Sequence, residues 1–425
     1  MNAAYLARMR RELEDYAAYE ACLGGPPARG VCVNALKISP RGFAALAPFA
    51  LSPVPWEERG FYIDEPRPGR SLYHDAGLFY VQEPSAMCAA PLLDVQPGER
   101  VLDLCAAPGG KSSQLAGAMQ GRGILVLNEK MPDRARILLQ NVERMGISNA
   151  VVTCASPEAL AERLEGYFDK VLVDAPCSGE GMLRKEPEAA AQWSEENVHM
   201  CAARQRKILQ SAAAMVAPGG RLVYSTCTFS RAEDEENAAW FAEAFPQFTL
   251  LRQQKLYPHR VRGEGHFAAL FGREEGEAPR PRAPRLPLDR RAAALWKEFA
   301  RGFLREEPQG ELLSFGQSLC LVPAGLFSLD GLKVLRAGLL LGKDAGGRFE
   351  PAHALAMAAP RAALRAKAEL NEEQARAYLR GEELEVSAPR GWCAACYGGW
   401  PLGLAKSAGT LKNHYPKGLR KPFAP

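Results

Sequence analysis

Short apolar runs alternate with amphipathic stretches through the middle of the chain. Runs of four or five apolar residues are typical of buried strands, and apolar residues that recur every three or four positions are typical of helices. The pattern predicts strands over residues 100–104, 123–127, 150–153, 170–173 and 221–224, and helices over 110–119, 132–145 and 195–217. This alternation favours an α/β fold with a parallel, doubly wound sheet.

The flanking regions have different patterns. Residues 2–23 predict one amphipathic helix, residues 31–36 a strand, and residues 40–70, which contain several prolines, an irregular segment. Prolines and arginines alternate over part of residues 272–290, as in a semi-rigid linker. We therefore divide the chain into an N-terminal module (1–70), a central domain (71–271), this linker (272–290) and a separate C-terminal region (291–425).

One further helix is predicted from side-chain chemistry. Ser230 and Glu233 have the spacing of a capping box, so a helix is expected to begin at Ser230. The acidic run from Glu233 to Glu236 would then lie in its first turn, where the helix dipole favours negative charge. We interpret this run as a cap with a solvated face rather than as a metal site.

Composition narrows the class of protein. A net charge of +4 permits nucleic-acid binding without requiring it. The eleven cysteines are scattered and odd in number, which does not indicate a disulfide framework, and neither a signal peptide nor a membrane span is found. We expect a cytoplasmic protein with free thiols. Residues 386–425 contain no acidic residue and mix basic with aromatic side chains, a composition that suits RNA.

Two cysteines follow two of the predicted strands. Cys177 lies in the sequence Asp174-Ala175-Pro176-Cys177, and Cys227 lies in Ser225-Thr226-Cys227. Chemistry in open α/β sheets gathers beyond the carboxyl ends of the strands. Two thiols beside Asp174 therefore suggest nucleophilic catalysis, in which a second group helps to release the product.

A turn of small residues after the first strand predicts a ligand site. It consists of Cys105, Ala106, Ala107, Pro108, Gly109, Gly110 and Lys111. It matches neither the dinucleotide fingerprint nor the P-loop, whereas Glu129, at the end of the second strand, is placed to bind ribose hydroxyls. A nucleoside without phosphates fits, and S-adenosylmethionine is the obvious candidate.

Two thiols suit methyl transfer to carbon 5 of a pyrimidine. A thiolate that adds to carbon 6 makes carbon 5 nucleophilic, and an acid at ring nitrogen 3 stabilises the charge that develops. The proton on carbon 5 must afterwards leave, and a second thiol can assist as a base.

These motifs resemble a known family. Residues 174–181, 224–227 and 102–111 are similar to the signatures of the Sun/nucleolar-protein family of RNA (cytosine-5) methyltransferases. Residues 410–418 resemble the end of its bacterial F-type branch, which acts on small-subunit (16S) ribosomal RNA. The resemblance implies a Rossmann-like core with an N-terminal RNA-binding module and a PUA-like C-terminal module. It also implies that Cys227 attacks, that Cys177 assists release, and that residues 105–111, Glu129 and Asp174 contact S-adenosylmethionine.

The chain departs from this family at some positions. Ser156 stands after the third strand, where related enzymes often carry an aspartate near the adenine, so it is the corresponding candidate. Cys32 replaces an arginine in the N-terminal module. Lys185 is equally interpretable as a phosphate contact and as a surface lysine. His266 is more often structural than catalytic at such a place, and Cys393 and Cys396 more often lie in a strand than bind zinc.

The sequence leaves other functions open. A tRNA or DNA cytosine-5 methyltransferase and an RNA chaperone without turnover are the alternatives. We expect RNA as the partner, no membrane, no metal, and a monomer.

Overall fold

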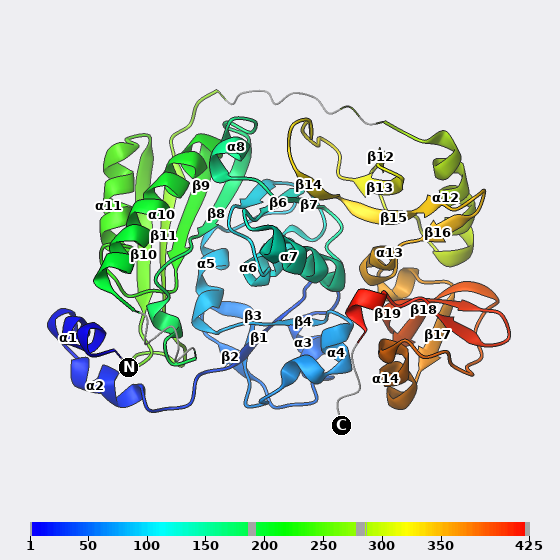
Figure 1. Cartoon of the computed structure of the whole chain (residues 1–425), viewed down its shortest axis with the longest axis horizontal. Coiled ribbons are helices and arrows are strands. Elements are labelled where there is room, and N and C mark those ends of the chain that lie inside the picture. Colours follow the sequence, from blue (N-terminus) through cyan, green and yellow to red (C-terminus); the bar gives the residue numbers. More distant parts are fainter. Residues whose placement is uncertain (1, 186–192, 278–284, 286, 421–425) are drawn as a thin grey trace.

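The computed structural model describes residues 2–185, 193–277, 285 and 287–420. Its centre is an eight-stranded sheet in the order β10-β11-β9-β8-β5-β6-β7-β14 (Figure 1). The strands are β5 (Arg100–Asp103), β6 (Ile124–Asn128), β7 (Ala150–Thr153), β8 (Phe168–Asp174), β9 (Val216–Thr226), β10 (Phe248–Leu256), β11 (His266–Arg273) and β14 (Val334–Ala337). The five strands from β9 to β7 are parallel, which confirms the doubly wound core. β10, β11 and β14 add antiparallel edges.

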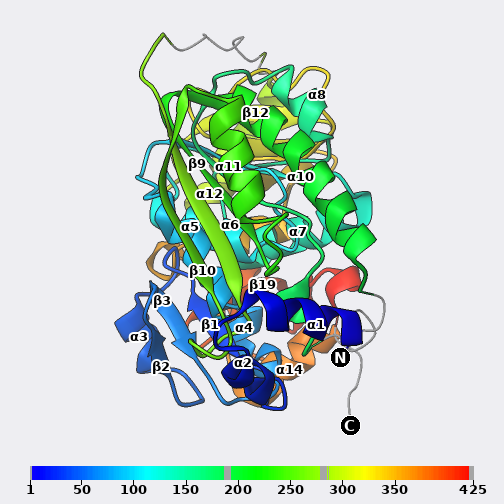
Figure 2. The same ribbon diagram turned by 90° about the vertical axis from the view of Figure 1, so that its left-hand side faces the viewer.

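Helices cover both faces of this sheet. The strands alternate their apolar side chains between two cores, so that Leu102 packs toward one face and Val101 toward the other. One face is covered by α8 (Pro157–Ala161), α10 (Glu195–Met215) and α11 (Glu235–Ala244), and the other by α5 (Ala89–Leu92), α6 (Gly110–Met119) and α7 (Pro132–Met145). Figure 2 shows α10 and α11 on the first of these faces. The predicted limits of α6 and α7 are confirmed.

The N-terminal module differs from the prediction in two respects. Residues 2–23 form two helices, α1 (Ala3–Glu12) and α2 (Tyr16–Cys22), because Leu13 has an extended backbone. Residues 40–70 are not irregular. They contain α3 (Pro40–Ala44), β2 (Ser52–Val54), β3 (Glu57–Tyr62) and the short 3-10 helix η1 (Pro68–Arg70).

The sheet of this module extends past the predicted boundary at residue 70. Its order is β2-β3-β1-β4, with β1 (Gly30–Val33) and β4 (Phe79–Val81) at one side, and α4 (Leu72–Asp75) precedes β4. The short 3-10 helix η2 (Ser85–Cys88) then leads into the central domain.

Two further sheets lie in the C-terminal region. The first contains β12 (Glu311–Phe315), β13 (Ser318–Val322), β15 (Leu339–Asp344) and β16 (Phe349–Pro351), and α12 (Arg290–Phe303) precedes it. The second contains β17 (Lys367–Leu370), β18 (Gly391–Tyr397), β19 (Trp400–Ser407) and β20 (Leu411–Asn413). The helices are α13 (His353–Ala358) and α14 (Glu372–Arg380), with 3-10 turns η4 (Arg361–Ala363) and η5 (Lys417–Leu419).

The C-terminal region is joined to the rest more closely than the expected separate unit. β14 pairs with β7 and so extends the central sheet. A single apolar cluster also combines Phe43 and Phe79 of the N-terminal module with Trp296 and Tyr378 of the C-terminal region. Part of the predicted linker, residues 278–284 and 286, lies outside the described residues. Within the described part of the chain, no helix is long and apolar enough to cross a membrane.

Candidate active site

The two cysteines meet at the carboxyl edge of the central sheet. β8 and β9 run parallel with Asp174 opposite Ser225, so the segments that follow these strands leave the sheet side by side. The sulfur atoms of Cys177 and Cys227 lie 3.3 Å apart, and both residues are half-buried. The backbone N–H of Gly181 donates to the carbonyl of Cys227 at 2.8 Å, which ties the two segments together. A single small ring could therefore contact both sulfur atoms.

Asp174 lies at the same edge of the sheet, and its carboxylate is ionised. Its Oδ2 pairs with Lys111 Nζ at 2.8 Å, and its Oδ1 accepts from Ser225 Oγ at 2.9 Å. Burial alone would raise the pKa of Asp174, but the ammonium of Lys111 outweighs it and lowers the pKa below its usual range. Burial likewise opposes the charge of Lys111, and the carboxylate raises its pKa in return.

His266 also faces this carboxylate. It is the first residue of β11, its ring is buried, and its Nε2 lies 3.7 Å from Oδ1 of Asp174. Burial, with a contribution from Lys111, lowers the pKa of His266 to about 3, so the ring is neutral. Neither ring nitrogen has a hydrogen-bond partner among the described residues. His266 is therefore a member of the site's inner wall.

The thiol of Cys177 holds its proton tightly. The hydrogen bond with Cys227 and then burial raise the pKa of Cys177 well above its usual range. Only a thiolate is an effective nucleophile, so Cys177 is poorly suited to attack from this state. Once deprotonated it is a strong base.

Glu233 holds the segment that carries Cys177, a role that the sequence did not predict. The predicted helix start at Ser230 is wrong, because α11 begins at Glu235 and its N-cap residue Asp234 makes no side-chain cap. Glu233 is fully buried instead of capping a helix. Its carboxylate accepts from the backbone N–H and the hydroxyl of Ser178, at 2.9 and 2.5 Å, and from Gln205 Nε2 at 2.9 Å.

The same network also fixes Pro176, the residue before Cys177 in the chain. Gln205 Nε2 also donates to the carbonyl of Pro176 at 3.2 Å. Both neighbours of Cys177 in the chain are thus fixed to one buried cluster. The sequence gives no signal of this, since an acid three residues after a serine is equally typical of a cap.

The N-terminal helix reaches the same loop. Arg8 of α1 pairs with Glu180 at 2.6 Å, and both side chains are almost fully buried. Glu180 begins the 3-10 helix η3 (Glu180–Met182), and it also accepts from Trp193 Nε1 at 2.9 Å and from the backbone N–H of Phe229 at 3.1 Å. Figure 2 shows α1 across the lower end of the sheet. The N-terminal helix therefore closes one side of the site.

The small-residue turn lies between β5 and α6. The bond between Ala107 and Pro108 is cis, and Gly109 has a φ of 115°, a conformation that favours glycine. A Cβ atom on Gly110 would lie 3.2 Å from the ring of Tyr80, which belongs to the N-terminal module. Below the turn, Asp103 accepts from Ser112 Oγ at 2.7 Å. Its other oxygen is buried and has no hydrogen-bond partner among the described residues.

The remaining predicted contacts lie along the neighbouring strand ends. Glu129 follows β6 and is buried, and its Oε1 accepts from the backbone N–H of Met131 at 2.9 Å. Ser156 caps α8 by accepting from the N–H of Ala159 at 3.3 Å. Asn128, which the sequence did not single out, donates to the carbonyls of Leu104 and Ala155 and so joins these ends.

This set of groups fits S-adenosylmethionine. The turn of small residues allows close approach to the backbone, Glu129 offers a buried carboxylate, and Asp103 has a buried oxygen free to accept a hydrogen bond from an ammonium group. The free carboxylate oxygen is the most specific of these features, because buried polar atoms normally have partners.

The other residues singled out in the sequence lie away from this edge or keep their expected character. Cys393 and Cys396 are buried free thiols in β18, and the described residues contain no cluster of three or more metal-ligating side chains. Cys32 is buried in β1. Lys185 is half-buried, and its backbone N–H donates to Met182.

Comparisons with known proteins cover nearly the whole chain. The model of the 16S rRNA methyltransferase RsmB/F family matches residues 90–272, and the N-terminal domain of 16S rRNA methyltransferase RsmF matches residues 1–84. The first C-terminal domain and the PUA domain of RsmF match residues 298–358 and 365–421. Ribosomal RNA small subunit methyltransferase F of Klebsiella pneumoniae (strain 342) is 34% identical, over 98% of this chain and 96% of that protein.

Solved structures share the fold of the central part. A methyltransferase homolog protein from Pyrococcus horikoshii is 28% identical with a TM-score of 0.56, over 64% of this chain and 100% of that one. NSun6 from Pyrococcus horikoshii with SFG is 19% identical with a TM-score of 0.57, over 64% of this chain and 97% of that one. The chain thus belongs to the RsmF branch of the RsmB/F family of 16S rRNA methyltransferases, which are S-adenosylmethionine-dependent enzymes.

Proposed function

We propose that the protein methylates carbon 5 of a cytosine in 16S ribosomal RNA through a covalent adduct on Cys227 that is released with the help of Cys177. The observation that supports this most directly is the 3.3 Å separation of the two sulfur atoms beside the carboxylate of Asp174. The identity of the RNA in this proposal is taken from the names of the family and of the relatives, which refer to 16S or small-subunit ribosomal RNA.

Cys227 attacks in this proposal. After loss of the thiol proton, its sulfur forms a bond to carbon 6, and the electrons of the carbon 5–carbon 6 double bond move so that carbon 5 becomes nucleophilic. An ionised carboxylate accepts hydrogen bonds, so Asp174 would hold the amino edge of cytosine and favour a proton on ring nitrogen 3. Lys111 keeps Asp174 ionised, and His266 closes the wall behind it.

Cys177 acts after transfer. Cys177 first loses its thiol proton to water; its thiolate then takes the proton from carbon 5, the double bond re-forms, and the electrons of the carbon 6–sulfur bond return to Cys227. The high pKa of Cys177 makes its thiolate a strong base for this step. Glu233 and Gln205 hold the segment on both sides of this thiol.

The cofactor supplies an electrophilic methyl group on sulfur. The turn from Cys105 to Lys111 would hold its methionine part together with Asp103, and Glu129 would accept from the ribose hydroxyls. Asp174 borders both the cofactor and the base. Ser156 is the weakest of the proposed contacts, because its hydroxyl already caps α8.

The location and the RNA-binding parts follow from the same reasoning. We place the reaction in the cytoplasm, where reducing conditions keep thiols free, as all eleven cysteines are here. In the PUA domain, the ring centres of Trp392 and His414 lie 4.4 Å apart with planes tilted by 59°, and Lys406 Nζ lies 5.5 Å from the centre of the Trp392 ring. Such a mixture of rings and cations suits RNA.

Two cysteine variants test the assignment of roles. Cys227→Ala is expected to abolish methyl transfer, whereas Cys177→Ala is expected to accumulate protein joined to RNA that survives on a denaturing gel. Cys22→Ala, in α2, removes a thiol that takes no part in the proposed reaction; it is the matched control and should behave like the wild type. Reversed phenotypes of the first two variants would show that the roles are exchanged.

The target nucleotide requires a separate experiment. Bisulfite sequencing of 16S ribosomal RNA from a strain that lacks this protein is expected to show one or more cytosines that lose their methyl group. An unchanged pattern in 16S RNA, with a loss in tRNA instead, would contradict the proposed substrate.

A further inference from the structure

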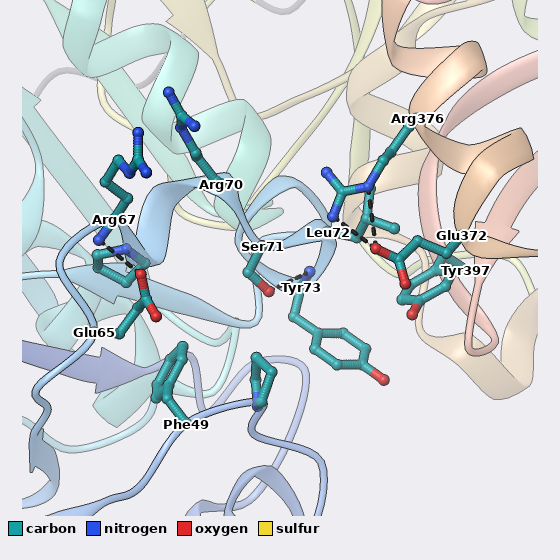
Figure 3. A pocket seen from close by; sticks show the side chains of 12 residues that line it. Phe49, Glu65, Arg67, Arg70, Ser71, Leu72, Tyr73, Glu372, Arg376 and Tyr397 are labelled. Carbon is teal, nitrogen blue, oxygen red and sulfur yellow. Dashed lines mark hydrogen bonds and ion pairs between the residues drawn. The ribbon is translucent and has the colours of Figure 1, made fainter. Parts of the chain in front are cut away.

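A pocket lies where the N-terminal module meets the PUA domain (Figure 3). Its volume is about 240 Å³. One wall comes from residues 48–49 and 65–73, and the other from α14 and the end of β18. Neither module forms it alone. Because the volume is below the roughly 300–1,000 Å³ of sites that enclose a whole small molecule, the pocket suits one unit of a longer chain that continues outside.

Unpaired positive charge lines the first wall. Arg67 and Arg70 are exposed, and Figure 3 shows them side by side on the segment before α4. Within the described part of the chain, neither guanidinium group makes an ion pair or a hydrogen bond. Glu65 accepts instead from the backbone N–H of Arg67 at 2.9 Å. An arginine fork without a carboxylate partner is well suited to phosphate.

The opposite wall carries a third arginine, whose positive charge is partly compensated by a neighbouring carboxylate. Arg376 of α14 lies across the pocket from Arg67 and Arg70 in Figure 3. It pairs with Glu372 at 2.8 Å, one turn earlier on the same helix. Exposed pairs of this kind are weak, so a phosphate can compete for the arginine.

Aromatic rings also line the pocket. Tyr73 and Tyr397 come from the two modules, with ring centres 5.5 Å apart and planes tilted by 46°. Phe49 also belongs to the lining, and its ring packs against Phe43 and Phe79. All three are only half-buried, so each side chain is partly accessible to an unpaired base.

The pocket has a rigid connection to the reaction site. Six residues after Tyr73, the chain enters β4, and Tyr80 of this strand packs against Gly110 of the cofactor turn. Arg144 of α7 donates to the carbonyl of His74 at 2.9 Å, which fixes α4 to the central domain. A chain held in the pocket is therefore held at a fixed place relative to the thiols.

We propose that this pocket binds one unpaired nucleotide of the substrate RNA outside the target base, with its phosphate on Arg67 and Arg70 and its base against Tyr73 and Tyr397. The inference rests on the proposed function for the identity of the RNA. It differs from RNA binding by the PUA domain in general, since half of the site belongs to the N-terminal module.

The test compares two double variants of the full-length protein. Arg67→Gln/Arg70→Gln removes two charges at the pocket, and Arg301→Gln/Arg305→Gln removes two exposed charges from the segment around the end of α12. Binding of a single-stranded 16S RNA fragment is measured by fluorescence anisotropy at several salt concentrations. Each phosphate contact to single-stranded RNA contributes about 0.7 to the slope of log affinity against log salt. Because the proposal places one phosphate on these two arginines, the pocket variant is expected to lower that slope by about 0.7, and the control variant to leave it unchanged.

A ring variant tests the other half of the site. Tyr397→Ala is expected to weaken binding on the order of tenfold, with little change in the salt slope, because stacking is not electrostatic. Methyl transfer at saturating RNA should be retained in the pocket and ring variants, with only the KM for RNA raised, and the control variant should keep both values.

Equal affinity and equal salt slope in the pocket and control double variants would overturn the proposal, and a protein ligand that binds the pocket without RNA would do the same. Binding is measured without methyl transfer. A wild type that binds RNA through the pocket and methylates no cytosine would therefore contradict only the proposed function.

Discussion

Glu233→Gln tests whether the buried carboxylate controls Cys177. Oε1 of Glu233 accepts from two N–H groups, those of Ser178 and Gln205, and Oε2 accepts from the hydroxyls of Ser178 and Thr228. A glutamine can place its oxygen at the position of Oε1 and keep both N–H donors. Its nitrogen then faces two hydroxyls, which can rotate to accept. The number of hydrogen bonds is kept and the charge is lost.

The size of the effect follows from that loss of charge. A hydrogen bond to a charged group contributes about 1.5–3 kcal/mol and a neutral one about 0.5–1.5 kcal/mol, so each N–H bond weakens by about 1 kcal/mol. Burial raises the pKa of Glu233, which means that the charge itself is costly, and its removal offsets part of this loss. Glu233→Ala instead leaves two buried N–H donors unsatisfied, at about 1–3 kcal/mol each.

We therefore expect a folded Glu233→Gln protein whose Cys177 segment is held less firmly. Release of the RNA adduct should slow by a factor of about five, which corresponds to about 1 kcal/mol. The assay follows the fraction of protein that migrates as a covalent RNA complex on a denaturing gel over time. Glu236→Gln removes an exposed charge from the same acidic run and is the matched control.

Two results would contradict this reasoning about Glu233. If Glu233→Gln loses methyl transfer while its adduct decays as fast as in Glu236→Gln, the carboxylate does not act through Cys177. A Glu233→Gln protein as unstable to heat as Glu233→Ala would show that the role is structural alone.

Two other predictions concern the charges around the site. Burial raises the pKa of Asp103 to about 7, so the folded protein keeps this proton between its unfolded pKa of about 3.9 and pH 7. The stabilisation of the folded protein by this proton is complete below about pH 4 and is lost as the pH rises to 7. Asp103→Asn should therefore flatten the fall in melting temperature over this range. An unchanged slope of melting temperature against pH would contradict the assignment. Arg8→Met leaves Glu180 buried without its partner, which costs about 3–5 kcal/mol of stability. Backbone hydrogen exchange should therefore become faster in residues 177–183. Equal exchange in the exposed Arg10→Met variant would argue against this.

The local pattern of apolar residues was sufficient to predict the elements whose limits depend on neighbouring residues in the chain. The apolar period of α7 and the proline at its start predicted its limits, and the three apolar residues and one threonine of β7 did the same. The break after Glu12 was missed because the apolar face continues through Leu13 and Tyr16. β14 was missed for a different reason: its four residues join the central sheet from a place about 180 residues further along the chain than β7, and no local period carries that information.

The site divides in the same way. That both thiols follow strands, and that parallel strands bring them to one edge, follows from the sequence. That the sulfur atoms lie 3.3 Å apart depends on contacts between segments: Ser178 with Glu233, Pro176 with Gln205, and Gly181 with the carbonyl of Cys227. Glu233 illustrates the difficulty, because the residues that make it resemble a helix cap are the ones that bury it. A group that sets the geometry of a site from beneath has no motif of its own, so variants of Glu233 can alter the release of the adduct while every recognisable catalytic residue remains in place.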